Sequence, residues 1–163
     1  MVDRRWKAYG VAAAVFTLDR LTKRIVENRF SFFDSYKVIP GFFEIVHTEN
    51  RGVAFGMLSG AAPGWPSVLL SVLTAAAVVA VSAVLWKARR LDQRALWGLA
   101  LILGGAAGNV ADRLAWGRVT DFLLFYIGQY QWPTFNLADS AIVIGSGLVA
   151  LDALRPNRQT NVS

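Results

Sequence analysis

The sequence has no cysteine and only one histidine, His47, among its 163 residues. The absence of cysteine excludes disulfide bonds, thiolate nucleophiles and cysteine-ligated metal sites. No H-E-x-x-H motif occurs, so the sequence also lacks the ligand pattern of a zinc protease. We therefore expect no metal ion and no other cofactor, and we interpret His47 as an ordinary residue of a surface sheet.

Charged residues are scarce as well: they make up 17% of the chain, against 55% hydrophobic residues. This composition is too apolar for an ordinary soluble domain and indicates a membrane protein. The net charge of +6 is compatible with binding to nucleic acid. However, the basic residues cluster beside apolar runs and form no continuous basic face with interspersed aromatics, so we expect no nucleic-acid partner.

Long apolar runs predict an all-α membrane protein, with one integral membrane domain over residues 1–163 and four transmembrane helices. A helix of about 20 apolar residues crosses the hydrocarbon core of a bilayer. The clearest run, Ser67 to Trp86, is uncharged throughout. The predicted spans cover residues 8–28, 67–86, 95–113 and 136–154.

The first span has a competing interpretation as a secretory signal peptide, because a basic start precedes a short apolar stretch, Ala8 to Leu18. A signal peptide should then show a cleavage site of the A-x-A type. The chain continues instead through Asp19 and Lys23, which lie one helical turn apart and are able to pair. A helix that runs on to Asn28 reaches spanning length, and we favour this retained helix.

Lysine and arginine residues are unevenly divided between the two sides that these spans define. One side contains Arg4, Arg5, Lys7, Lys87, Arg89, Arg90, Arg94, Arg155 and Arg158. The other side contains Arg29, Lys37, Arg51 and Arg118. Because cytoplasmic loops carry the excess of positive charge, we expect both termini in the cytoplasm and the segments 29–65 and 115–134 outside it.

The two outer segments differ in character. The first contains β-prone residues from Phe42 to His47, followed by a glycine-rich stretch, Gly52 to Gly60. It predicts a small sheet on the membrane surface. The second is rich in tryptophan, tyrosine and phenylalanine, and we interpret it as an interfacial aromatic element. A plain aromatic belt and a contact with substrate are both open for it.

Polar residues of the predicted spans gather at the outer level of the membrane. A charged side chain in lipid costs at least about 2.5 kcal/mol, so an intramembrane acid is a functional candidate by default. Asn109 and Arg113 share one helix face, and so do Asn136 and Asp139, which allows both pairs to face one interior. The residues expected at this level are Asp19, Asn109, Asp112, Arg113, Asp121, Asn136 and Asp139.

The third span also contains Gly104 and Gly108, a small-xxx-small pair that lets a neighbouring helix approach closely. We interpret these glycines as packing residues. Tight packing at this face would hold Asn109 and Arg113 in place. For Asp112 and Arg113, a simple charge pair at the membrane interface remains open.

Two carboxylates are the strongest candidates for chemistry in this polar region. If Asp121 and Asp139 approach closely, they cannot both ionise readily and would share a proton. One would activate water as a base, and the other would donate a hydrogen bond to a scissile carbonyl, without a covalent intermediate. A serine nucleophile such as Ser140, or one paired with Lys23, has no supporting spacing.

Short motifs recur along the chain in a characteristic order. They are Asp19-x-x-Thr22-Lys23, Asn50-x-Gly52-x-Ala54-Phe55-Gly56, Gly104-Gly105-Ala106-x-Gly108-Asn109-x-x-Asp112-Arg113, Val119-x-Asp121-Phe122 and Phe135-Asn136-x-Ala138-Asp139-Ser140. Together they closely resemble the motifs of the bacterial lipoprotein signal peptidases, also called signal peptidase II. Each motif alone is weak, whereas the ordered set covers nearly the whole chain and is highly specific.

This resemblance implies four transmembrane helices with a small extracytoplasmic β-cradle in the bacterial inner membrane, and an active site near the outer face. It implies an aspartic endopeptidase that removes the signal peptide of a prolipoprotein just before a cysteine carrying diacylglycerol. The partners are then the lipid-modified prolipoprotein and membrane lipids, and we expect a monomer. On this pattern Asp121 and Asp139 match the catalytic pair. The residues that support the pair or bind substrate are Asp19, Lys23, Asn50, Gly52, Asn109, Arg113 and Asn136.

Two other functions remain open on the sequence alone. A small proton-coupled transporter also carries paired acids inside a helix bundle, but it needs acids along a path through the membrane. The inner halves of the predicted spans lack them, apart from Asp152. A non-catalytic lipid-binding membrane protein would use the aromatic outer segment as its interface, and replacing either candidate aspartate would leave its function intact.

Overall fold

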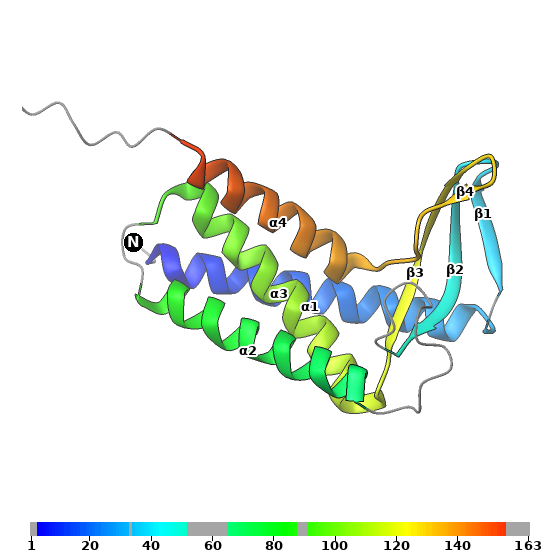
Figure 1. The fold of residues 1–163 in the computed structure, drawn as a ribbon, viewed down its shortest axis with the longest axis horizontal. Coiled ribbons are helices and arrows are strands. Elements are labelled where there is room, and N and C mark those ends of the chain that lie inside the picture. Colours follow the sequence, from blue (N-terminus) through cyan, green and yellow to red (C-terminus); the bar gives the residue numbers. More distant parts are fainter. Residues whose placement is uncertain (1–2, 33, 52–64, 88–90, 156–163) are drawn as a thin grey trace, which may run out of the picture.

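The structure of the chain, a computed structural model, describes residues 3–32, 34–51, 65–87 and 91–155. Helices α1 to α4 form an elongated bundle, and a small sheet stands at one end of it (Figure 1). The start of α1 and the end of α4 lie at the opposite end of the bundle from the sheet. Two strands of this sheet come from the chain between α1 and α2, and the other two come from the chain between α3 and α4.

The helices are α1 (Arg4–Arg29), α2 (Trp65–Lys87), α3 (Gln93–Trp116) and α4 (Leu137–Ala153). Asp3 accepts a hydrogen bond from Arg5 N at the start of α1, and Asp92 does the same for Gln93 N at the start of α3. Such side-chain caps satisfy amides that have no partner within the helix. Gly117 ends α3 in a left-handed conformation, with φ of 68°, which glycine adopts without steric cost.

Each predicted span falls on one of these helices, but their crossing of a membrane stays a prediction. Within the described residues, Val68–Lys87 and Gln93–Trp116 are long and apolar enough to span a bilayer by composition alone. α1 fails that test because of its charged residues, and α4 has only 17 residues. Large apolar side chains such as Val79 on α2 and Val143 on α4 are exposed, as expected for helices that face lipid.

Glycines of α3 set how closely the bundle packs. A Cβ atom at Gly104 would lie 2.5 Å from the Ala12 carbonyl oxygen of α1, and one at Gly105 would lie 2.4 Å from the Ala138 carbonyl oxygen of α4. α3 therefore touches helix backbone on two sides, which only small residues allow. The close helix approach predicted from Gly104 is confirmed, and α1 is the helix that approaches.

The sheet is antiparallel with the order β1-β2-β3-β4, formed by β1 (Ser35–Ile39), β2 (Phe43–Asn50), β3 (Val119–Ile127) and β4 (Tyr130–Gln131). The predicted strand around residues 42–47 is confirmed as part of β2. Gly41 and Gly128 provide positive φ angles in the turns after β1 and β3. The predicted glycine-rich stretch 52–60 lies outside the described residues.

The aromatic segment 115–134 has a more definite structure than the sequence suggested, because it contains β3 and β4 of this same sheet. Phe125 stacks on Phe43 of β2 with ring centroids 4.6 Å apart, and on Phe135 at 5.9 Å. Offset or stacked aromatic pairs of this kind stabilise a sheet beyond their buried area. Phe125 of this segment therefore helps to hold the sheet together, whether or not it also lies at a membrane interface.

Replacing Gly145 by alanine should destabilise the bundle. The added Cβ would lie 2.5 Å from the Gly98 carbonyl oxygen and 2.9 Å from Ile102 Cγ1, so α3 and α4 must separate. Overpacking of this kind costs about 1–3 kcal/mol. Thermal unfolding of the purified protein in detergent measures the change.

Gly147 on the same helix is the matched control, since an added Cβ meets nothing within 4 Å. Gly147→Ala should raise the free energy of unfolding by up to about 1 kcal/mol, because alanine favours helix over glycine. Equal unfolding temperatures for the two variants would contradict the proposed close contact.

Candidate active site

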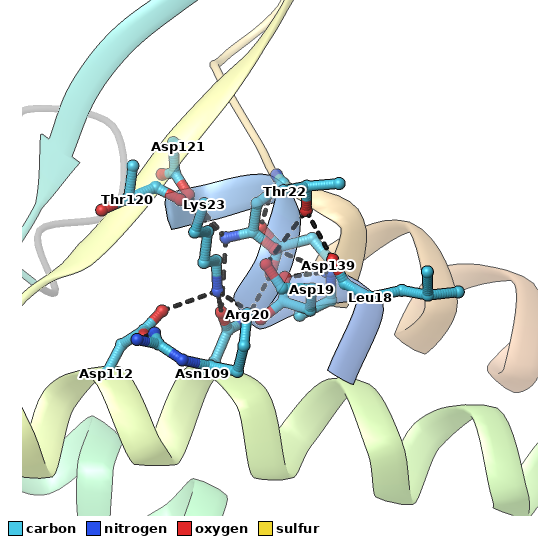
Figure 2. Close-up of polar contacts among 12 residues, drawn as sticks. Leu18, Asp19, Arg20, Thr22, Lys23, Asn109, Asp112, Thr120, Asp121 and Asp139 are labelled. Atoms are coloured by element: carbon cyan, nitrogen blue, oxygen red, sulfur yellow. Dashed lines mark hydrogen bonds and ion pairs between the residues drawn. The ribbon is translucent and has the colours of Figure 1, made fainter. Parts of the chain in front are cut away.

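Buried polar side chains gather where the helix bundle meets the sheet (Figure 2). They come from α1, α3, β3 and the residue that precedes α4. The buried polar or charged residues of the described chain are Asp19, Lys23, Asn109, Asp112, Thr120, Asp121 and Asn136. A polar cluster in an otherwise apolar bundle is stable only if its members satisfy one another, and the hydrogen bonds show that they do so.

Asp121 lies on β3 opposite Thr48 of β2, and its side chain is turned toward the bundle. Thr48 Oγ1 donates to the backbone oxygen of Asp121 at 3.1 Å, which holds the strand at this point. Two amides donate to the carboxylate: Asn136 Nδ2 to Oδ1 at 2.7 Å and Asn50 Nδ2 to Oδ2 at 3.1 Å. Only 2% of the residue's surface is exposed.

Asp139 lies in the first turn of α4 and forms a reciprocal capping box with Asn136. Asn136 Oδ1 accepts from Asp139 N at 3.0 Å, and Asn136 N donates to Asp139 Oδ2 at 3.2 Å. Asn109 Nδ2 of α3 donates to the other carboxylate oxygen at 2.8 Å. The helix start therefore fixes this carboxylate through backbone geometry as well as side-chain contacts.

Asn136 joins the two carboxylates, since its side-chain amide binds Asp121 while its backbone N–H binds Asp139. Burial, and after it the nearby charge of Asp139, raise the pKa of Asp121 from its ordinary value to about 6. The hydrogen bonds from Asn50 and Asn136, together with the charge of Lys23, partly offset this rise in the pKa. The predicted approach of the two acids is thus present in the structure.

A second cluster of charges lies beneath this pair, between α1 and α3 (Figure 2). Lys23 Nζ contacts Asp19 Oδ2 and Asp112 Oδ2, each at 2.7 Å. Arg20 also forms an ion pair with Asp112, and its guanidinium lies 4.5 Å from the centre of the Trp116 ring. Asp19 and Lys23 are fully buried, which makes their mutual neutralisation obligatory.

The cations that Asp112 pairs with are Lys23 and Arg20 of α1, not Arg113, with which the sequence had left an interfacial pair open. Arg113 is half-buried, and the charges of Asp121 and Asp139 act on it. Its Nε atom is buried and makes no hydrogen bond within the part of the chain that the structure describes. Arg113 thus lies near the two aspartates, and its role at the site stays a prediction.

Sequence reasoning missed the contact that docks β3 against the helices. Thr120 Oγ1 donates to Glu27 Oε1 of α1 at 2.7 Å. Thr120 directly precedes Asp121, so this hydrogen bond holds β3 against the C-terminal end of α1 beside the candidate acid. The strand character of residues 119–127, an alternation of Val, Thr, Phe and Leu around the acid, was the signal available in the sequence.

Two further expectations concern residues at the margins of the site. Gly52 lies outside the described residues. His47 belongs to β2, where its Nδ1 lies 2.9 Å from the Phe30 backbone oxygen, consistent with an ordinary sheet residue. Among the described residues, no group of three or more histidine, cysteine, aspartate or glutamate side chains is arranged to hold a metal ion.

Two carboxyl groups that are both bound by one residue, Asn136, form the kind of pair with which aspartic peptidases activate water. On a helical bundle with an apolar outer surface, such a pair is compatible with a membrane enzyme of the aspartic peptidase class. The comparison of sequences is more specific: the family model described as signal peptidase (SPase) II matches residues 11–155. The chain belongs to this family.

Named relatives support the same assignment. The chain is 60% identical over the full length of both sequences to a protein of Solibacter usitatus named lipoprotein signal peptidase. A protein of the same name from Paraburkholderia phymatum is 45% identical, over 90% of this chain and 86% of the relative.

Solved structures described as bacterial membrane enzymes determined by the in meso method share the fold. One has a TM-score of 0.81 at 29% identity, covering 96% of this chain and 94% of that chain. Another also has a TM-score of 0.81, at 27% identity, covering 93% of this chain and 94% of that one. The bundle and its sheet are therefore the fold of known bacterial membrane enzymes.

Replacing Asn50 by alanine should raise the pKa of Asp121 above its value of about 6. A hydrogen bond donated to a carboxylate favours the ionised form, and its loss shifts the pKa upward by about one pH unit. Carboxyl-detected NMR titration of the purified protein measures this. Thr48→Val is the control, because Thr48 donates to the backbone oxygen of Asp121 and not to its carboxylate. An unchanged Asp121 titration in Asn50→Ala would refute the assigned contact.

Proposed function

We propose that this protein is an aspartic endopeptidase that removes signal peptides from diacylglyceryl-modified prolipoproteins, and that Asp121 and Asp139 are its catalytic pair. The observation that carries the proposal is that Asn136 binds both carboxylates, Asp121 through its side-chain amide and Asp139 through its backbone N–H. Membership of the signal peptidase II family supplies the class of substrate. The scissile bond is then the peptide bond on the amino-terminal side of the lipidated cysteine.

The pair works with one proton shared between the two acids. The ionised carboxylate removes a proton from water as the water oxygen attacks the scissile carbonyl carbon, and the protonated acid transfers its proton to the carbonyl oxygen. The C–N bond of the resulting tetrahedral intermediate then breaks as the leaving nitrogen takes up a proton from the pair. Burial favours the singly protonated state, because two adjacent negative charges in a poorly solvated site repel each other.

Neutral amides and one arginine complete the electrostatics of the site. Lys23 and Arg20 balance Asp19 and Asp112, so that this lower cluster has no net charge. The singly protonated pair then carries one negative charge, and Arg113 is the cation that offsets it. Asn109 and Asn136 stabilise the carboxylates by hydrogen bonds without adding charge.

The proposed orientation places all four helices across the bacterial inner membrane, with both termini in the cytoplasm and the sheet outside. The sheet and both chain ends described by the structure lie at opposite ends of the bundle, which supports this arrangement (Figure 1). The positively charged residues near the chain ends favour the cytoplasmic side. A monomer suffices, since α1, α3, β3 and α4 of one chain supply the whole pair and its charged support. The lipid chains of the substrate remain in the bilayer beside the site.

Replacing Asp121 or Asp139 by asparagine should each abolish cleavage while leaving the protein inserted in the membrane. Asparagine keeps the shape of aspartate but neither releases nor accepts the proton, so the rate should fall by about 10²- to 10⁴-fold or more. A gel-shift assay of the purified protein with a lipidated prolipoprotein measures cleavage. Near-normal cleavage by either variant would exclude the aspartic mechanism and favour a transporter or a lipid-binding protein.

Asp92→Asn is the matched control, since Asp92 caps α3 at the opposite end of the bundle and asparagine caps equally well. It should cleave like the wild-type protein. The same precursor without its diacylglyceryl group should be a poor substrate. Efficient cutting of that unmodified precursor would contradict dependence on the lipid.

The absence of native cysteine permits a direct test of orientation. Tyr130→Cys on β4, where 86% of the residue is exposed, should react with a membrane-impermeant maleimide added to intact spheroplasts. Gln93→Cys at the start of α3 should react only after the membrane is permeabilised. Labelling of Gln93→Cys from outside, without labelling of Tyr130→Cys, would reverse the proposed topology.

A further inference from the structure

Lys23 is the largest fully buried side chain of the described residues, and none of its surface reaches solvent. We propose that Lys23 is a positioning residue for cleavage: its ammonium fixes the orientation of the Asn109 amide, which in turn keeps a hydrogen-bond donor against Asp139. This inference rests on the proposed function, because it assigns a role to a residue that does not touch the reacting atoms.

The hydrogen-bonding capacity of lysine carries the argument. An ammonium group has three N–H donors and no acceptor. The contacts of Lys23 Nζ are Asp19 Oδ2 at 2.7 Å, Asp112 Oδ2 at 2.7 Å and Asn109 Oδ1 at 3.0 Å. All three donors are thus in use, and the group that faces Lys23 from Asn109 has to be the oxygen (Figure 2).

The other end of the Asn109 amide then has to be the donor that faces Asp139. Asn109 Nδ2 lies 2.8 Å from Asp139 Oδ1. A reversed amide would set its NH₂ group against the Lys23 ammonium and its oxygen against the Asp139 carboxylate, which are both repulsive contacts. Asn136 Nδ2 reinforces the observed orientation, since it donates to Asn109 Oδ1 at 3.3 Å.

The consequence for catalysis concerns the proton that the pair shares. A protonated Asp139 would otherwise be able to turn the amide and donate its proton to the oxygen of Asn109. Lys23 prevents this reversal, and the second Asp139 oxygen faces a backbone N–H of Asn136, which cannot reverse. Both oxygens of Asp139 therefore face donors only, so that the shared proton is left to Asp121 and the substrate.

Charge neutralisation is the competing role, because Lys23 also pairs with two buried acids. Asp19 uses its other oxygen to accept from Ala138 N at 2.9 Å in the first turn of α4. Replacing Lys23 alone would leave a buried carboxylate without its counter-charge and disturb this helix start. The experiment therefore has to remove the ammonium without leaving an excess negative charge.

The double variant K23M/D112L meets this requirement, since it removes one cation and one anion and fills the space with apolar groups. Arg20, which pairs with Asp112 in the wild-type protein, remains as the cation of the cluster beside Asp19. We expect the variant to fold, with an unchanged KM and with kcat lower by about 10- to 100-fold, the effect of losing one charge-assisted hydrogen bond. Wild-type cleavage by K23M/D112L would overturn the proposal and leave charge neutralisation as the only role of Lys23.

The pH profile of cleavage separates positioning from a loss of folded protein. The catalytic pair loses a hydrogen bond that favours its ionised form, so the pH optimum of cleavage should move upward, whereas a smaller active fraction lowers kcat without moving the optimum. The charged groups around Asp139 are Asp121 from β3, Arg113 from α3, and Asp19 and Lys23 from α1. The double variant removes Lys23 from this set and Asp112 from the cluster beneath it, so the net charge of the whole buried cluster is unchanged. A reduced kcat with an unmoved optimum would also overturn the proposal.

Asn109→Asp provides a second test that does not depend on the folding of the double variant. It retains an oxygen toward Lys23 and replaces the donor toward Asp139 by a second carboxyl oxygen, and it should therefore also move the pH optimum upward. A wild-type profile for Asn109→Asp would overturn the proposal. Arg24→Met, one residue beyond Lys23 with an exposed side chain, is the control and should change neither kcat nor the profile.

The outcome is distinguishable from failure of the proposed function. Wild-type protein and Asp139→Asn are assayed beside the double variant with the same lipidated prolipoprotein. If the wild-type protein does not cleave, or Asp139→Asn does, the peptidase assignment fails. If these two behave as expected and K23M/D112L cleaves normally, only the role of Lys23 fails.

Discussion

Holding two carboxyl groups together away from water is the constraint on which the rest of this structure depends. An isolated buried charge costs several kcal/mol, and two like charges side by side cost more. Asn136 offsets this cost by binding Asp121 and Asp139 at the same time. Lys23 and Asn109 extend the network into the bundle, so that each buried acid has a donor or a cation against it.

The packing of the helices makes this network possible. Gly108 of α3 has Asp19 of α1 against it, where an added Cβ would lie 2.5 Å from Oδ2. Gly105 brings the Ala138 backbone of α4 equally close on another side. α3 is thus narrow at the level where the carboxylates and amides meet. Small residues here serve the site as well as the bundle, because they allow short hydrogen bonds between three helices.

Much of the site was readable from local patterns. Apolar runs located the helices, and the spacing of Asn136 and Asp139 placed both side chains at one helix start, where the structure shows a capping box. The ordered motifs indicated the family and the pair of acids. The sheet was predicted only in its first half, because the aromatic residues of 119–127 suit a membrane interface as well as a strand. The ion pair between Lys23 and Asp112 was not predicted.

The sequence by itself determined where the chain is helical, which few polar residues lie within apolar surroundings, and the family to which these belong. Only the tertiary structure decided which of these residues meet. Lys23 and Asn109 are 86 positions apart, and Asn50 and Asp121 are 71 apart. Helical periodicity and capping act over a few residues and are therefore visible in sequence. Strand pairing, close helix approach and buried ion pairs form between distant segments, so their geometry exists only once the chain has folded.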